Sequence, residues 1–159
     1  MAKKTLEKTG NKVSKNYFHE VYKDAFMVLY RDDQYQFYEI RYTPNAFNLF
    51  KIEDAKTVIN NSMIAFQKEI DKNHNYQILI INTLDGGPTI ERQTQEYVHS
   101  VLFPFFIKHG IQTHLYCLGE EVISKLSMSV TAEKYQSEDI QSHFFARYKD
   151  CIDWIKTNT

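Results

Sequence analysis

The most constraining feature of this sequence is the apolar run Ile-Leu-Ile-Ile at residues 78–81. The run shows no alternation of apolar and polar residues, so we expect neither face of a strand formed here to meet water. A strand covered on both faces usually lies in the middle of a sheet, with helices above and below it. The run is followed by Asp85-Gly86-Gly87-Pro88, a strong turn signal. We therefore expect a central strand and, at its carboxyl end, a loop of the kind where open α/β sheets gather their sites.

The segments before this run predict strands and then a helix. Aromatic and β-branched residues dominate residues 17–21, 26–31 and 35–42, and the polar break at residues 31–34 indicates an antiparallel hairpin. Apolar residues then recur at spacings of three and four over residues 51–72, which predicts an amphipathic helix.

The segments after the run alternate between helix and strand. A helix is expected from Thr89, as its N-cap, to Gly110, as its left-handed final residue, with a kink at Pro104. The remaining expected elements are a strand at 111–118, a helix at 119–126, a short strand at 143–147 and a final helix from Tyr148.

This order predicts an α/β fold: a mixed, mostly parallel sheet with an N-terminal antiparallel hairpin and helices packed on it. We expect one domain over residues 16–159, preceded by a flexible, lysine-rich tail at residues 1–15.

Composition narrows the classes of function. The net charge of -1 provides no basic field for nucleic acid, and no apolar run approaches the roughly 20 residues that cross a bilayer. The first residues lack the apolar core of a secretory signal. Cys117 and Cys151 have neither metal-binding spacing nor the pattern of a disulfide framework. We expect a cytoplasmic protein with reduced thiols, without a nucleic-acid partner or a membrane span.

The loop after the central strand is the best candidate for a site. Asp85 stands where α/β enzymes often place an acid, yet Asp and Gly are also ordinary turn formers. The sequence contains no phosphate-binding glycine motif, no serine-hydrolase elbow and no paired histidines for a metal. We expect no catalytic residue, no metal and no cofactor; catalysis by Asp85 is kept as an alternative.

Two threonines flank the loop. Thr83 ends the strand and Thr89 begins the helix, which are structural roles. Phosphorylation is the functional alternative, because about two added negative charges are tolerated at a helix N-terminus and would change the surface that a partner meets.

Three stretches of the sequence share the pattern of a known family. They are residues 77–82 with the loop that follows, residues 101–110 (Val-Leu-Phe-Pro-Phe-Phe-Ile-Lys-His-Gly) and residues 144–155, a short aromatic segment before a helix ending in Trp and Ile. These stretches resemble the STAS / SpoIIAA-like family, especially its small stand-alone, lipid-transfer-related members. The resemblance spans residues 16–156 and implies a mixed sheet flanked by helices and a non-enzymatic, regulatory or binding role.

The loop departs from the family at one point. Anti-sigma antagonists of this family carry a phosphorylatable Ser in an Asp-Ser-Ser-Gly turn after the central strand. The corresponding loop here runs from Asp85 to Ile90 and contains no Ser, so the phosphorylation switch is not carried over.

Two functions remain open. The first is a regulatory or protein-interaction module with a protein partner, which would contact an exposed loop. The residues of this expected interaction loop are Asp85, Gly86, Gly87 and Thr89. The alternative is a carrier of a small apolar ligand in a pocket near residues 83–90. The aromatic residues expected to line that pocket are Phe103, Phe105 and Phe106. A closed pocket at the loop would favour the carrier or an enzyme, and a flat exposed face would favour the interaction module.

Overall fold

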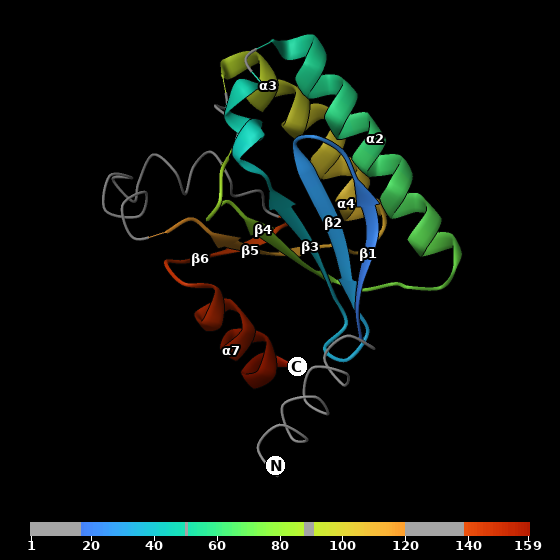
Figure 1. Cartoon of the computed structure of the whole chain (residues 1–159). Coiled ribbons are helices and arrows are strands. Elements are labelled where there is room, and N and C mark those ends of the chain that lie inside the picture. Colours follow the sequence, from blue (N-terminus) through green and yellow to red (C-terminus); the bar gives the residue numbers. More distant parts are fainter. Residues whose placement is uncertain (1–16, 50, 88–90, 120–138) are drawn as a thin grey trace, which may run out of the picture.

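The computed structural model describes residues 17–49, 51–87, 91–119 and 139–159, and within these residues six strands form one sheet (Figure 1). The strands follow one another across the sheet in chain order. The first three pair antiparallel, and the third to the sixth pair parallel. The predicted mixed, mostly parallel sheet is therefore confirmed. The strands are β1 (Phe18–Lys23), β2 (Met27–Asp32), β3 (Phe37–Tyr42), β4 (Ile78–Asn82), β5 (Thr113–Cys117) and β6 (Gln141–Phe145).

Helices cover both faces of the sheet. The described helices are η1 (Pro44–Asn48), α2 (Ile52–Asp71), α3 (Arg92–Tyr97), η2 (Val98–Leu102), α4 (Phe103–Lys108) and α7 (Tyr148–Asn158). Helix α2 and the continuous run α3-η2-α4 lie on one side of the sheet, and α7 lies on the other side (Figure 1). The parallel crossovers through α2 and through α3-η2-α4 therefore return on the same face.

Strand β4 lies inside the sheet, between β3 and β5. The side chain of Leu79 joins a core cluster with Phe66 of α2 and Phe106 of α4. Ile80 points to the opposite face and joins a cluster with Cys151 and Ile155 of α7. The predicted two-sided burial of this strand is confirmed by these two clusters.

Two expected elements differ from the structure in where they begin or end. The helix after the loop begins at Arg92 with Glu91 as its N-cap residue, so the prediction that Thr89 caps it is wrong by two positions. No side chain caps this helix start, and its first turn is not fixed by a sequence signal. The last strand spans Gln141–Phe145, two residues earlier than predicted. The predicted tail at residues 1–15, Thr89 itself and most of the helix predicted at 119–126 lie outside the described residues.

The helical run changes its hydrogen bonding just before Pro104. Proline has no N–H and therefore cannot bond the carbonyl four residues earlier. The residues before it, η2, form a π-helical segment in which the amide of Phe103 donates to the carbonyl of Val98, five residues earlier. The helical run thus contains a π-helical segment before Pro104, a feature that frequently occurs at functional sites.

The C-terminal end of α4 is closed by Gly110, as predicted. Gly110 has a φ of 73°, in the left-handed region that glycine adopts without strain. Its amide donates to the carbonyl of Ile107, and the amide of Ile111 donates to that of Phe106. These two bonds form a Schellman motif, and the buried Ile111 supplies its hydrophobic contact. The chain is then directed into β5.

Because β4 is buried on both faces, we expect truncation of a side chain on either face to cause a similar loss of stability. We expect Leu79→Ala and Ile80→Ala each to lower the free energy of unfolding by about 2 to 5 kcal/mol, because both side chains are buried in close-packed cores. Ile64→Ala, at a position that is 56% exposed, is the matched control and should stay within about 0.5 kcal/mol. Urea denaturation measures all three. A large loss for only one of the two β4 variants would show that one face of the strand is uncovered.

Candidate functional site

A cavity of about 370 Å³ lies between the sheet and the helical run α3-η2-α4, beside the loop after β4. This volume is at the lower end of the range of small-molecule sites, roughly 300 to 1,000 Å³. The lining residues from the strands are Ile40, Tyr42, Leu79, Ile81, His114 and Tyr116. Those from the helices are Val98, Leu102, Phe103 and Phe106, and those from the strand ends and the loop are Thr83, Gly87 and Leu118.

The fold explains why the cavity lies here. Tyr42, Thr83 and Leu118 stand at or just beyond the carboxyl ends of β3, β4 and β5, three neighbouring parallel strands. Sites in open α/β sheets form at this edge because loops leave the strands there. On the helical side, Val98 and Leu102 belong to the π-helical segment η2. The cavity therefore occupies the place where the helix above the sheet departs from α-helical geometry.

The wall of the cavity is apolar and aromatic, with one buried histidine. The side chain of His114 is 1% exposed and packs edge-to-face against Phe103 and Phe106, with ring centroids 5.9 and 5.2 Å away. Its Nε2 lies 3.0 Å from the carbonyl oxygen of Ile111. Its Nδ1 is buried and makes no hydrogen bond within the described structure.

Burial determines the protonation state of His114. Removal of the ring from water lowers its pKa to about 4, and the hydrogen bond to Ile111 offsets this only in part. The imidazole is therefore neutral at neutral pH. In a neutral imidazole one nitrogen donates and the other accepts. Because Nε2 faces a carbonyl oxygen, Nε2 carries the proton and Nδ1 is left as an unpaired acceptor.

The loop beside the cavity is held in place by hydrogen bonds and close packing with the neighbouring strands and η1. The amide of Leu84 donates to Oδ1 of Asn82 at 3.0 Å, and Nδ2 of Asn82 donates to Glu39 at 3.0 Å. The amide of Thr83 donates to the carbonyl of Cys117 at 3.0 Å. Gly86 packs against the start of η1, where a Cβ would contact the backbone oxygen of Thr43 and lie 2.9 Å from Cα of Pro44. Only glycine fits at this position.

The residues of the expected interaction loop lie in different environments. Asp85 is exposed and is not part of the cavity lining. Gly86 packs on the backbone at residues 43–44, and Gly87 lines the cavity. Thr89 lies outside the described residues. Thr83, considered above for phosphorylation, lines the cavity and donates from Oγ1 to the carbonyl of Cys117 at 3.1 Å.

The three phenylalanines expected at a pocket separate into two groups. Phe103 and Phe106 lie on the same face of α4 and line the cavity. Phe105 does not line it; its ring packs against Phe66, Phe106 and His109. Residues three apart share a helix face and a residue between them does not, so helical periodicity alone could have removed Phe105 from the expected lining.

Sequence reasoning missed the contributions of His114 and of the π-helical residues. The signal for His114 was present, because it is the one residue of the strand Thr113–Cys117 whose side chain normally titrates near neutral pH. The lining by Val98 and Leu102 had no signal of its own, since it depends on hydrogen bonding in the helical run before Pro104.

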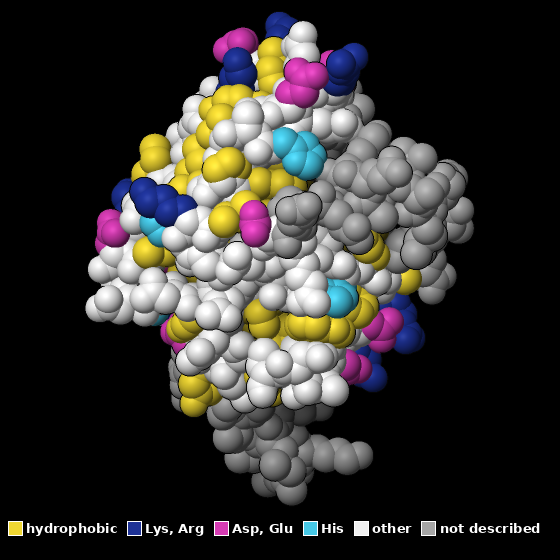
Figure 2. Space-filling model, turned by 180° about the vertical axis from the view of Figure 1, so that it is seen from behind, with side chains coloured by type: hydrophobic (Ala, Val, Ile, Leu, Met, Phe, Trp, Pro, Cys, Tyr) yellow, Lys and Arg dark blue, Asp and Glu magenta, His cyan; other side chains and the backbone are white. Residues whose placement is uncertain are grey.

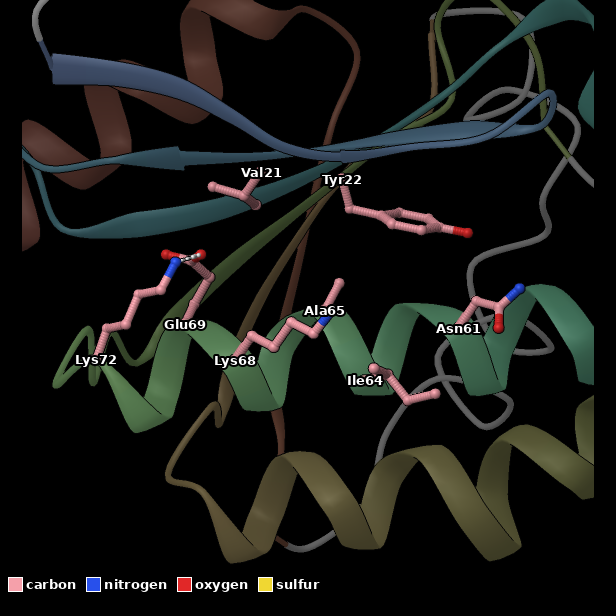
Figure 3. Close-up of a pocket in the computed structure, with 8 residues that line it drawn as sticks. All are labelled: Val21, Tyr22, Asn61, Ile64, Ala65, Lys68, Glu69 and Lys72. Atoms are coloured by element: carbon pink, nitrogen blue, oxygen red, sulfur yellow. Dashed lines mark hydrogen bonds and ion pairs between the residues drawn. The ribbon is translucent and has the colours of Figure 1, made fainter.

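A second, shallow cavity of about 360 Å³ lies between β1 and α2 (Figure 3). Glu69, its only carboxylate in the described lining, already has partners: it pairs with Arg31, with His74 at 3.0 Å and with Lys72 at 3.4 Å. Burial alone would raise the pKa of Glu69, but the hydrogen bonds from Arg31 and His74 outweigh it and hold the pKa below its usual value. This cluster joins β2, α2 and the turn after α2, which is a structural role.

A polar group buried under α7 is also fully engaged. Glu39 is 0% exposed and accepts hydrogen bonds from Arg41 at 2.8 Å, Asn82 at 3.0 Å and the hydroxyl of Tyr148 at 2.6 Å. A buried carboxylate is tolerated only with partners of this kind. The group links the central strands to α7 and orients Asn82, which in turn holds the loop.

The two cysteines, far apart in the sequence, lie together beneath α7. Cys117 of β5 and Cys151 of α7 are both fully buried free thiols. The hydrogen bond between them lowers the pKa of Cys117. The same bond, together with burial, raises the pKa of Cys151 far above the value of an exposed thiol. A thiol held in this protonated state is unreactive.

No group of three or more His, Cys, Asp or Glu side chains in the described ranges is arranged to hold a metal ion. Among the same residues, no helix has the length and apolar character needed to cross a membrane.

Comparison with protein-family models, with curated proteins and with solved structures finds no match to this chain. The resemblance to the STAS / SpoIIAA-like family therefore stays an expectation from the sequence pattern. The site has to be interpreted from its own geometry.

Because Gly86 packs closely against backbone atoms, we expect the stability of the protein to be sensitive to substitution of this residue. We expect Gly86→Ala to lower the free energy of unfolding by about 1 to 3 kcal/mol, because the new Cβ meets backbone atoms that cannot rotate away. The neighbouring exposed variant Asp85→Ala should change it by less than about 0.5 kcal/mol. Thermal or urea denaturation compares the two, and equal effects would contradict the packing described here.

The buried histidine predicts an acid-sensitive stability. The pKa of His114 is about 4 in the folded chain and about 6.5 in an unfolded one, so the unfolded chain binds more protons between these values. Stability should therefore fall as the pH falls from about 6.5 to about 4, by roughly 3 kcal/mol from this residue. In His114→Leu this contribution should be absent. Urea denaturation at several pH values measures it, and parallel pH profiles for the two proteins would contradict a depressed pKa.

Proposed function

We propose that this protein binds a small, neutral, apolar molecule in the cavity between the sheet and α3-η2-α4, and acts as a carrier or sensor of that molecule. The observation that carries the proposal is the cavity itself: a volume in the range of ligand sites, at the carboxyl ends of parallel strands, with an apolar and aromatic wall.

The composition of the wall supports binding without catalysis. The described lining residues include no carboxylate, lysine, arginine, serine or cysteine. Thr83, Tyr42 and Tyr116 are the lining residues whose hydroxyl groups could also serve in catalysis. General acid–base and nucleophilic catalysis more often use a carboxylate, lysine, serine or cysteine, or a histidine whose pKa is near the working pH. His114, with a pKa of about 4, does not meet that condition. Asp85, the alternative considered for catalysis, points to solvent outside the lining.

The resemblance to small, lipid-transfer-related members of the STAS / SpoIIAA-like family agrees with an apolar cargo. It adds support of a different kind, since it rests on sequence patterns at residues 77–82, 101–110 and 144–155, whereas the cavity is an observation of packing.

A second candidate is a regulatory module that binds a protein partner through the loop after β4. It is favoured by Leu84, an apolar residue of this loop that is 43% exposed. Its neighbour Asp85 is also exposed. Figure 2 shows, on the face opposite that of Figure 1, hydrophobic side chains gathered in the upper half with charged side chains toward the margins. Such a surface suits a protein contact. The loop also borders the cavity through Gly87, so cargo and partner could be linked.

Filling the cavity should abolish binding. We expect the wild-type chain to bind naphthalene, with amide chemical shift changes in NMR spectra concentrated at the lining residues. Leu102→Trp places a larger side chain into the cavity from the partly exposed η2 and should remove this binding. Ile64→Trp makes a comparable change on the exposed face of α2, outside this cavity, and is the control that should bind as the wild type does.

Two results would contradict the proposal. One is a wild-type chain that shows no naphthalene binding, which would favour the interaction module instead. The other is a Leu102→Trp variant that remains folded and binds as tightly as the wild type, which would show that the ligand occupies another place.

A further inference from the structure

The unpaired nitrogen of His114 indicates which molecules the cavity selects. Buried polar side-chain atoms almost always have a hydrogen-bond partner, and one without a partner calls for an explanation. An unsatisfied buried acceptor destabilises a fold by about as much as a lost hydrogen bond contributes. Nδ1 of His114 is such an atom, in a side chain that is 1% exposed and lines the cavity.

The orientation of the ring leaves this nitrogen without a partner from the protein. Nε2 lies 3.0 Å from the carbonyl oxygen of Ile111, and this contact fixes which edge of the imidazole faces the backbone. Ile111 is itself fixed by the Schellman motif at the end of α4. Phe103 and Phe106, which also line the cavity, pack edge-to-face against the ring and hold its plane. The position of Nδ1 is therefore set before any ligand arrives.

From this geometry we infer that the cavity selects neutral apolar molecules that carry one hydrogen-bond donor, such as an alcohol or a phenol, whose O–H donates to Nδ1 of His114. The inference rests on the proposed function and specifies the chemical class of its ligand. The apolar body of the molecule packs against the aromatic and aliphatic wall, and the single donor orients it.

The same geometry binds hydrocarbons more weakly and excludes carboxylates. A hydrocarbon of the same shape leaves Nδ1 unpaired, and sites built to bond a hydroxyl discriminate strongly against analogues that lack it. A carboxylate, such as a fatty acid anion, brings only acceptor oxygens toward an acceptor nitrogen. The described lining contains no lysine or arginine that could pair with it. Burial of an unpaired carboxylate is highly unfavourable.

A water molecule is a weaker partner for this nitrogen than a ligand hydroxyl. A buried water is stable when it makes two to four hydrogen bonds. Most side chains around His114 in the cavity wall are hydrocarbon or aromatic, including Phe103, Phe106 and Leu79. A ligand hydroxyl needs only the one bond, because the rest of the molecule is held by apolar contacts.

Three probes of one shape test the inference on the full chain: 2-naphthol, 2-methylnaphthalene and 2-naphthoate. We expect 2-naphthol to bind the wild type at least about 3- to 10-fold more tightly than 2-methylnaphthalene, the range that one neutral hydrogen bond gives. Binding of 2-naphthoate should not be detected. Titrations followed by NMR amide shifts or by calorimetry give the three affinities, and the shift changes locate each probe.

Two variants assign the preference to His114. In His114→Leu the preference for 2-naphthol over 2-methylnaphthalene should be lost or reversed, because the acceptor is gone while the apolar wall remains. In His114→Asn the preference should persist, because the amide oxygen of Asn lies close to the position of Nδ1. Should either variant fail to fold, the ¹⁵N resonance of Nδ1 in the wild type provides the test: it should shift on addition of 2-naphthol and not on addition of 2-methylnaphthalene.

The outcomes separate this inference from the proposed function. If none of the three probes binds the wild type, the proposed function fails and the inference fails with it. If 2-methylnaphthalene binds as tightly as 2-naphthol, or if 2-naphthoate binds best, the cavity binds apolar molecules but the inference is overturned. A preference for 2-naphthol that is unchanged in His114→Leu, or a ¹⁵N resonance that does not move, would show that His114 is not the acceptor.

Discussion

The burial of β4 on both faces is the constraint on which the rest of this structure depends. Leu79 is enclosed by the layer of α2 and α4, and Ile80 is enclosed by α7. A strand covered in this way must be joined to its parallel neighbours by crossovers that pass over the sheet. The loop at its carboxyl end is thereby placed beneath the helical run that follows, and the cavity lies where that loop, three strand ends and the run meet.

The cavity is a departure from close packing that the surrounding structure maintains. Interiors normally fill their space, and an empty cavity destabilises a fold in proportion to its volume. Here the space borders the π-helical segment η2, while Gly86 and Asn82 hold the loop from the other side. A partly open cavity with an apolar wall and one unpaired polar atom is suited to a ligand, whose binding would add contacts and stabilise the folded state.

Periodicity in the sequence was enough to predict the sheet, the long helix α2, the end of α4 at Gly110 and the fold class. It was not enough to predict the cavity, because the walls come from segments that are separated by more than 70 residues, such as Ile40 and Tyr116. Packing between such segments leaves no local pattern. The same reason explains why no sequence pattern indicated that Cys117 and Cys151 lie together beneath α7. The position of Thr89 relative to the helix start was wrong, since no side-chain cap fixes that start.

The most direct test of this account is whether the partly open space between the sheet and η2 holds a small apolar guest. Apolar cavities of this kind take up xenon, so crystals of the protein would be pressurised with xenon and examined for its anomalous scattering. The account predicts a xenon peak within contact distance of Ile81, Leu102 and Phe106. An interior in which these side chains close on one another, with no xenon between them, would contradict it.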